Sequence, residues 1–242
     1  MELLAAVALS LVGSGGGVLL ASPLLLLRRQ TRLSLVPGLI SYAVGTLLGV
    51  ALLALVPEAL ETLQAPAALG ALLAGILGFF MLEKLVVWRH CHTDDCDAHD
   101  TNATLLLIGG GVHCFADGAI VGASVLTSLP LGITPALAVA AHQVPQEVGD
   151  YAILLDAGYT RSRAFVLNAL SASTSALGAI AVYGATNWTP GALPYVLAFA
   201  AGSFLYVAMS DLIPGLHRSA VDVGAVRQVM LIAAGIYTIV LL

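Results

Sequence analysis

The sequence predicts an all-α fold, a polytopic transmembrane helical bundle of about eight helices with both termini extracytoplasmic. Three observations predict it: the composition, a succession of apolar segments, and the positions of the basic residues. Of the 242 residues, 59% are hydrophobic and only 10% are charged, which is too few to give a soluble domain its polar surface. A transmembrane helix needs about 20 mostly apolar residues, so about eight helices use nearly the whole chain. We therefore expect a single integral-membrane domain over residues 1–242.

Eight apolar segments follow one another along the chain, and prolines mark several of the connectors. The segments cover residues 3–27, 35–60, 66–88, 103–129, 131–155, 164–186, 192–213 and 223–242. The first segment does not resemble a cleavable signal peptide, because Glu2 stands where such a peptide is basic. The longest connector, about 89–102, is expected to be a cytoplasmic loop.

All the basic residues fall on one side of this eight-helix topology. They are Arg28, Arg29 and Arg32 in the first connector, Lys84 and Arg89 at the third, Arg161 and Arg163 at the fifth, and Arg218 and Arg227 at the seventh. Because Lys and Arg are concentrated in cytoplasmic loops, this side is predicted to be the cytoplasm. A helix count that was wrong by one would scatter these charges over both faces.

Glycines four residues apart occur in three of the segments, as Gly13–Gly17, Gly45–Gly49 and Gly118–Gly122. Small residues at this spacing let neighbouring helices approach closely, so we expect helix contacts there. The run Gly109 to Gly111 has two interpretations, close packing or a deformable helix just before His113.

The fourth and fifth segments carry polar residues at mid-membrane depth, where an ionisable group costs about 2.5–3.5 kcal/mol on insertion scales. His113 and Asp117 are four residues apart, as are His142 and Gln146, so each pair shares a helix face. A lone intramembrane histidine is often only a structural hydrogen bonder, but here the pattern occurs on two consecutive segments. Two imidazoles with a carboxylate suit Zn²⁺ and similar divalent transition metals, so a metal site is predicted.

Pro145 lies inside the fifth segment and has no N–H group. The carbonyl group of Ala141 therefore loses its helical partner next to His142, and we expect the helix to bend there. Broken helices at this depth are common in transporters.

These residues also carry a resemblance to a known family. The stretches HCFADGAIVGAS (113–124) and HQVPQEVGDYAILL (142–155) resemble the ZIP (Zrt/Irt-like, zinc-iron permease) family, whose fourth helix typically reads H-N-x-x-[DE]-G and whose fifth reads H-E-x-P-H-E-x-G-D. LVPEALE (55–61) and GSFLYVAMSDLIP (202–214) are similar to the family's second and seventh helices. The resemblance implies alternating-access transport of divalent metal toward the cytoplasm, with Zn²⁺ as the first expectation and Fe²⁺, Mn²⁺, Co²⁺ or Cd²⁺ as other substrates.

The resemblance further implies two adjacent metal sites. The primary site would comprise His113, Asp117, His142 and Gln146, and the second site Cys114, Asp117, Gln143 and Gln146, with Asn168 from the sixth segment. Three positions depart from the family pattern: Cys114 replaces Asn, Gln143 replaces an acid, and Gln146 replaces His or Glu. The second site therefore loses charge. A buried Cys114 could equally serve as a small hydrophobic residue.

Two further acids, Glu147 and Asp150, follow in the fifth segment. They are expected either to join or orient the metal ligands or to form hydrogen bonds between helices. The connector after the third segment adds a cytoplasmic cluster of candidate metal ligands, with a solvated loop as the alternative. Its candidates are His90, Cys91, His92, Cys96 and His99.

Two other functions are compatible with the same residues: a membrane-embedded zinc-dependent hydrolase, and a metal-binding sensor without flux. The transport hypothesis expects no catalytic residues and no cofactor, with the metal as substrate. The expected partners are divalent metal ions and the lipid bilayer, with no nucleic acid, and the sequence allows a homodimer. The short loops favour a prokaryotic inner membrane.

Overall fold

The computed structural model describes residues 1–24, 26–88, 98–218 and 224–242, and the secondary structure in these ranges is helical. Its elements are α1 (Glu2–Leu24), α2 (Arg29–Gly49), η1 (Val50–Leu55), α3 (Val56–Thr62), α4 (Ala65–Trp88), α5 (Ala98–Thr127), α6 (Leu129–Asp156), α7 (Arg161–Trp188), η2 (Pro190–Ala192), α8 (Leu193–Tyr206), η3 (Val207–Leu212), α9 (Ile213–Arg218) and α10 (Ala225–Val240). Because α2, η1 and α3 are continuous, and α8, η3 and α9 likewise, the described chain forms eight long helical segments. This confirms the predicted all-α bundle.

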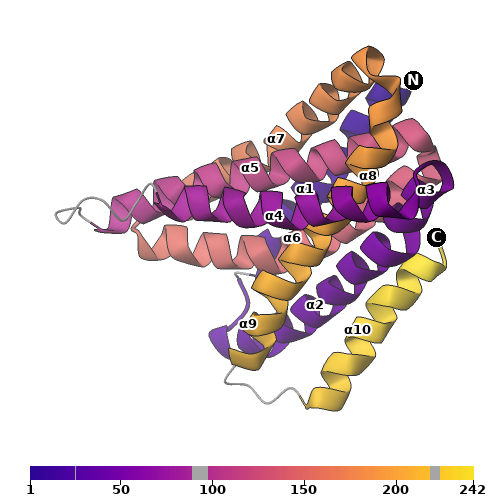
Figure 1. The fold of residues 1–242 in the computed structure, drawn as a ribbon. Helices are drawn as coiled ribbons and strands as arrows, with labels where there is room; N and C mark the ends of the chain where they lie inside the picture. Colours follow the sequence, from indigo (N-terminus) through magenta and orange to yellow (C-terminus); the bar gives the residue numbers. More distant parts are fainter. Residues whose placement is uncertain (25, 89–97, 219–223) are drawn as a thin grey trace.

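Six helical segments of the described chain are long and apolar enough to cross a membrane. They are Glu2–Leu24, Ser34–Thr62, Ala65–Lys84, Leu107–Thr127, Arg161–Thr186 and Leu193–Leu216. Of the other two, α10 has only 16 residues, and α6 carries the polar residues of the fifth segment. Figure 1 shows both chain ends at the same end of the bundle, as an even number of crossings requires. Which end faces the cytoplasm stays a prediction.

The helices pack in two groups of four segments. In the first group α5 packs on α7, and α1 packs on α5, α6 and α7. In the second group α10 packs on α2, and α4 and the η1–α3 segment pack on α8. Figure 1 shows α2 and α10 running side by side, apart from α5 and α7. Between the groups, α2 contacts α6, and α5 contacts α8.

Glycines hold each group together. A Cβ atom added at Gly118 would overlap the Ser175 carbonyl of α7, and one at Gly45 would overlap the Ile232 carbonyl of α10. Lipid tails are as apolar as leucine, so the association of membrane helices depends on such close packing. The predicted packing role of the spaced glycines is therefore confirmed for these helices.

Two long segments contain a π-helical turn ending two residues before a proline. In the second segment the N–H of Val56 donates to the Ala51 carbonyl, and Pro57 follows. In the seventh segment the N–H of Ile213 donates to the Ala208 carbonyl, and Pro214 follows. A proline ring clashes with the carbonyl four residues earlier and supplies no donor, so a wider turn accommodates it.

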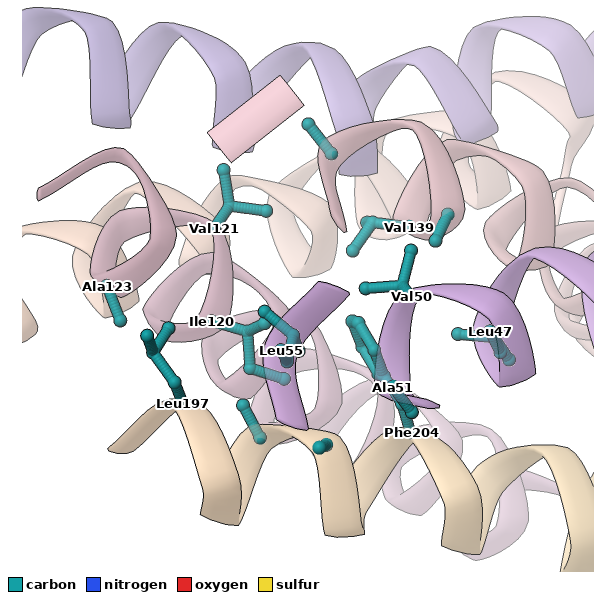
Figure 2. Packing of buried hydrophobic residues seen from close by; sticks show 14 of the residues in the cluster. Leu47, Val50, Ala51, Leu55, Ile120, Val121, Ala123, Val139, Leu197 and Phe204 are labelled. Atoms are coloured by element: carbon teal, nitrogen blue, oxygen red, sulfur yellow. The ribbon is translucent and has the colours of Figure 1, made fainter. Parts of the chain in front are cut away.

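The largest apolar cluster lies where the two groups meet. Figure 2 shows side chains of α2 and η1, α5, α6 and α8 converging there. Val50 and Leu55 belong to the second group, and Val121 and Val139 to the first, and all four are fully buried. This cluster, which we call the apolar seal, separates the two groups by side chains that form no polar contacts.

α5 begins at Ala98, inside the range 89–102 where we expected a loop. Residues 98–102 are therefore helical, and the connector is shorter at this end. The sequence explains this, since neither glycine nor proline occurs between Ala98 and Ile108 to stop the helix.

Candidate metal centre

Helices α5 and α6 bring three potential metal ligands to one point. His113 and Asp117 are one turn apart on α5, so their side chains share a face, and α6 places His142 opposite them. Asp117 Oδ2 lies 3.4 Å from His113 Nε2 and 3.2 Å from His142 Nε2. The two Nε2 atoms are 3.1 Å apart. All three ligand atoms thus lie within 4.8 Å of one another, close enough to surround one ion.

A backbone contact fixes the protonation of His142. Its Nδ1 lies 2.9 Å from the Ala138 carbonyl oxygen, one turn back along α6. Because a carbonyl can only accept, Nδ1 carries the hydrogen, and in the neutral ring Nε2 keeps its lone pair. The lone pair on Nε2 faces His113 and Asp117. A histidine that binds a metal through Nε2 needs this tautomer.

The centre is buried, and the charge of its carboxylate is not balanced by a hydrogen-bond donor of the described chain. The side chains of Asp117 and His142 are 2% and 1% exposed, and that of His113 is 14% exposed. Oδ2 of Asp117 makes no hydrogen bond among the described residues, and the two imidazoles beside it form ion pairs with it only when they are protonated. A buried carboxylate beside neutral imidazoles is costly, and a cation between Asp117 and the imidazoles would remove that cost.

Two aromatic rings of the second helix group flank the histidines. Phe79 of α4 stands edge-on to His113 at 6.3 Å, and Phe204 of α8 stands edge-on to His142 at 6.2 Å between ring centres. Both phenylalanines are buried. Sequence reasoning missed them, because each lies in an apolar segment that shows nothing to distinguish it from packing residues. The rings close the centre on the side that faces the second group.

Pro145 lies inside α6, which is helical from Leu129 to Asp156. The predicted bend stays a prediction, since a helix can bend at a proline without being interrupted. The flanking turns of a long helix held by α1 and α5 keep the segment helical.

The second site, with Cys114, Asp117, Gln143, Gln146 and Asn168, stays a prediction. Gln143 donates its Nε2 to Cys114 Sγ at 3.0 Å, and both residues are buried. Gln146 lies one turn beyond His142 and is half-buried. Glu147 and Asn168 are buried, and each has a polar atom without a hydrogen-bond partner in the described chain.

The predicted cytoplasmic cluster falls mostly outside the described residues. His90, Cys91, His92 and Cys96 are not among them, and of His99 only the helical backbone is described.

The chain is similar to known zinc transporters. A family model described as "ZIP Zinc transporter" matches residues 87–242. Zinc transporter ZIP13 of Homo sapiens is 31% identical over 258 aligned positions, which cover 84% of this chain and 69% of the relative. Zinc transporter YKE4 of Saccharomyces cerevisiae is 31% identical, with 81% and 66% covered.

Zinc transporter ZIP6 of Homo sapiens is 38% identical over 128 residues. That match covers 52% of this chain but only 17% of ZIP6, so the chain spans a small part of this longer relative. These relatives are eukaryotic, and the expectation of a prokaryotic inner membrane gains no support from them. The matched region contains both α5 and α6 with their histidines and Asp117. The chain is an integral membrane protein that belongs to the ZIP zinc transporter family.

Proposed function

We propose that this protein moves Zn²⁺ across the membrane toward the cytoplasm, with His113, Asp117 and His142 holding the ion at mid-membrane depth. The observation that carries the proposal is that their three ligand atoms lie within 4.8 Å of one another, and that the carboxylate oxygen among them makes no hydrogen bond in the described chain. Imidazole and carboxylate ligands suit Zn²⁺, and also Fe²⁺, Mn²⁺, Co²⁺ and Cd²⁺. The names of the relatives as zinc transporters favour Zn²⁺.

A transport site must also release its ion. Three protein ligands leave at least one coordination position, which water or the Gln146 amide oxygen would fill. A neutral amide binds zinc more weakly than a carboxylate or imidazole, so this set favours exchange over permanent retention. Cys114 and Gln143, which bond to each other, supply no charge to a neighbouring site.

The two helix groups suggest how access alternates. The first group (α1, α5, α6 and α7) carries the metal ligands and would move against the second group (α2 to α4, and α8 to α10). Within each group glycines allow backbone contact, whereas the seal between the groups is built from apolar side chains of the described helices. Residues of the seal follow Asp117 on α5 and precede His142 on α6, so they close the path toward the end where both termini lie.

Zinc uptake into proteoliposomes containing a zinc-sensitive dye tests the proposal. Asp117→Asn keeps the shape of the side chain but removes its charge, and should lower the initial uptake rate about 10-fold or more. Glu2→Gln, the same change at an exposed position, should transport like the parent. A folded and inserted parent that moves none of the five metals would refute transport.

Two other functions, a membrane-embedded hydrolase and a metal-binding sensor, were compatible with the sequence. The family is one of transporters, so the membrane-embedded hydrolase has no support from the comparisons. A metal-binding sensor would bind Zn²⁺ with the same three ligands but show no flux in this assay. The homodimer and the metal-binding role of the cytoplasmic cluster stay predictions.

A further inference from the structure

One face of α6 is polar toward the interior of the first helix group. Gln143, Glu147 and Tyr151 are spaced four residues apart and form one stripe. At one end of it, Gln143 donates to Cys114 of α5 and its Cβ lies against Gly17 of α1. At the other end the hydroxyl of Tyr151 lies 3.1 Å from Ser22 Oγ of α1. Glu147, between them, therefore faces the same interior and is only 3% exposed.

Helix α7 contributes a polar side chain to this interior. Asn168 lies one turn from Ala164 and one turn from Ala172, and both alanines pack in a cluster with Cys114 and Tyr151. Asn168 thus shares the face of α7 that packs inward, and it is 2% exposed.

Three polar atoms in this region have no hydrogen-bond partner among the described residues: Gln143 Oε1, Glu147 Oε2 and Asn168 Nδ2. The Nε2 atom of Gln143 donates a hydrogen bond to Cys114, so Oε1 is the atom of this amide that remains without a hydrogen bond. Leaving a buried polar atom unpaired is costly, so such groups usually bind water or an ion.

Asp150 adds a second carboxylate three residues beyond Glu147 on α6, and like charges one turn apart on a helix repel each other. Asp150 faces α5 and α7, since a Cβ added at Gly110 of α5 would lie 3.9 Å from Asp150 Oδ2 and 3.1 Å from Ser171 Oγ. Two carboxylates one turn apart in a buried interior form an oxygen-rich environment that favours a divalent cation.

We propose a second cation site, in which Glu147 and Asp150 bind a partly hydrated divalent cation inside the first helix group. These acids lie about 7 and 12 Å along α6 from His142, away from the apolar seal. The site rests on the proposed transport function, in which it receives the ion released from His113, Asp117 and His142. The negative charge that Cys114 and Gln143 do not provide beside the primary centre is thus supplied one to two turns further on.

Metal titration of the purified full-length protein tests this site without measuring transport. The predicted cytoplasmic cluster is first removed by replacing His90, His92 and His99 with Gln and Cys91 and Cys96 with Ser, and this background serves as the parent. Its Zn²⁺ binding by isothermal titration calorimetry should give two ions per chain. Glu147→Gln combined with Asp150→Asn should lose one ion, and Asp117→Asn should lose the other. Co²⁺ absorption identifies which ion remains, because an imidazole-rich site of low coordination number absorbs far more strongly than a hydrated all-oxygen site. The double variant should keep the intense band, and Asp117→Asn should lose it.

The outcomes separate the two proposals. A parent that binds one ion, with an intense Co²⁺ band that the double variant retains, would leave only water at Glu147 and Asp150 and overturn this site alone. Loss of the intense band in the double variant would make the two acids positioning residues for the histidine centre, which also overturns it. A parent without any intense band would count against the primary site and hence the proposed function. Glu147→Gln alone serves if the double variant does not fold, and Glu2→Gln is the matched control.

Discussion

At the scale of single residues, the centre combines a feature that sequence periodicity predicts with features that it does not. The spacing of His113 and Asp117, repeated at His142, places ionisable groups at mid-membrane depth, and the cost of such groups identifies them as functional. Phe79, Phe204 and the Ala138 carbonyl were not predictable, because their roles depend on which helix faces which. The Gln143–Cys114 hydrogen bond was likewise hidden, since a pair of neutral residues can either bind metal or bind each other.

The buried carboxylate of Asp117 predicts that Zn²⁺ stabilises the folded parent and that the Asp117→Asn variant loses most of this stabilisation. Zn²⁺ should raise the melting temperature of the parent, because a ligand at 100 times its dissociation constant stabilises the folded state by about 2.7 kcal/mol. Asp117→Asn should melt no lower than the parent in a chelator, since a buried unpaired charge is removed, and should lose most of the Zn²⁺-dependent rise. Thermal melts in detergent with chelator or excess Zn²⁺ measure both effects. A variant that melts well below the parent in chelator would show that the charge is stabilised without metal.

At the scale of helices, hydropathy and the placement of basic residues predicted eight segments, and the structure shows them. The π-helical turns before Pro57 and Pro214 were not predicted, because a proline inside a segment signals a distortion without saying whether the helix bends, breaks or widens. Glycine spacing predicted close contacts but not the partners. Gly118 meets Ser175 on a parallel helix two segments away, a pairing that only the packed bundle decides.

Two glycines of α7 provide a matched pair for testing helix packing. A Cβ at Gly178 would overlap the Phe115 carbonyl of α5, whereas nothing lies within 4 Å of a Cβ at Gly184. Gly178→Ala should therefore push α5 away from α7, cost about 1–3 kcal/mol of stability, and weaken Zn²⁺ binding through the nearby His113. Gly184→Ala should be neutral or slightly stabilising, since alanine favours helix. Melting temperature and Zn²⁺ affinity report the two effects, and equal behaviour of the two variants would contradict this packing.

At the scale of the whole molecule, the division into two groups of four segments is the property that the sequence least revealed. Every segment has an apolar sequence, so hydropathy cannot show which helices pack together as one group or at which interface the two groups would move against each other. The distinction arises from packing: glycine contacts lie within the groups, and the apolar seal lies between them. The seal consists of buried apolar side chains, among them Val50, Val139 and Phe204, and such side chains can separate and meet again without leaving unpaired hydrogen-bonding groups.

This division predicts a difference in reactivity between two buried positions. In a background where Cys91, Cys96 and Cys114 are replaced by Ser, Val139→Cys places a thiol in the seal and Ala172→Cys places one inside the first group. Val139 and Ala172 are 0% and 1% exposed, so a static structure would protect both thiols equally. If the groups move apart during transport, a membrane-impermeant maleimide added from outside should label Val139→Cys, at a rate that Zn²⁺ alters, and should spare Ala172→Cys. Mass spectrometry of proteoliposomes with outward-oriented protein measures the labelling.

Protection of both thiols, with transport intact, would rule out separation at the seal. Labelling of both would mean that the first group itself opens, and the ion would then travel between α1, α5, α6 and α7 without relative motion of the two groups.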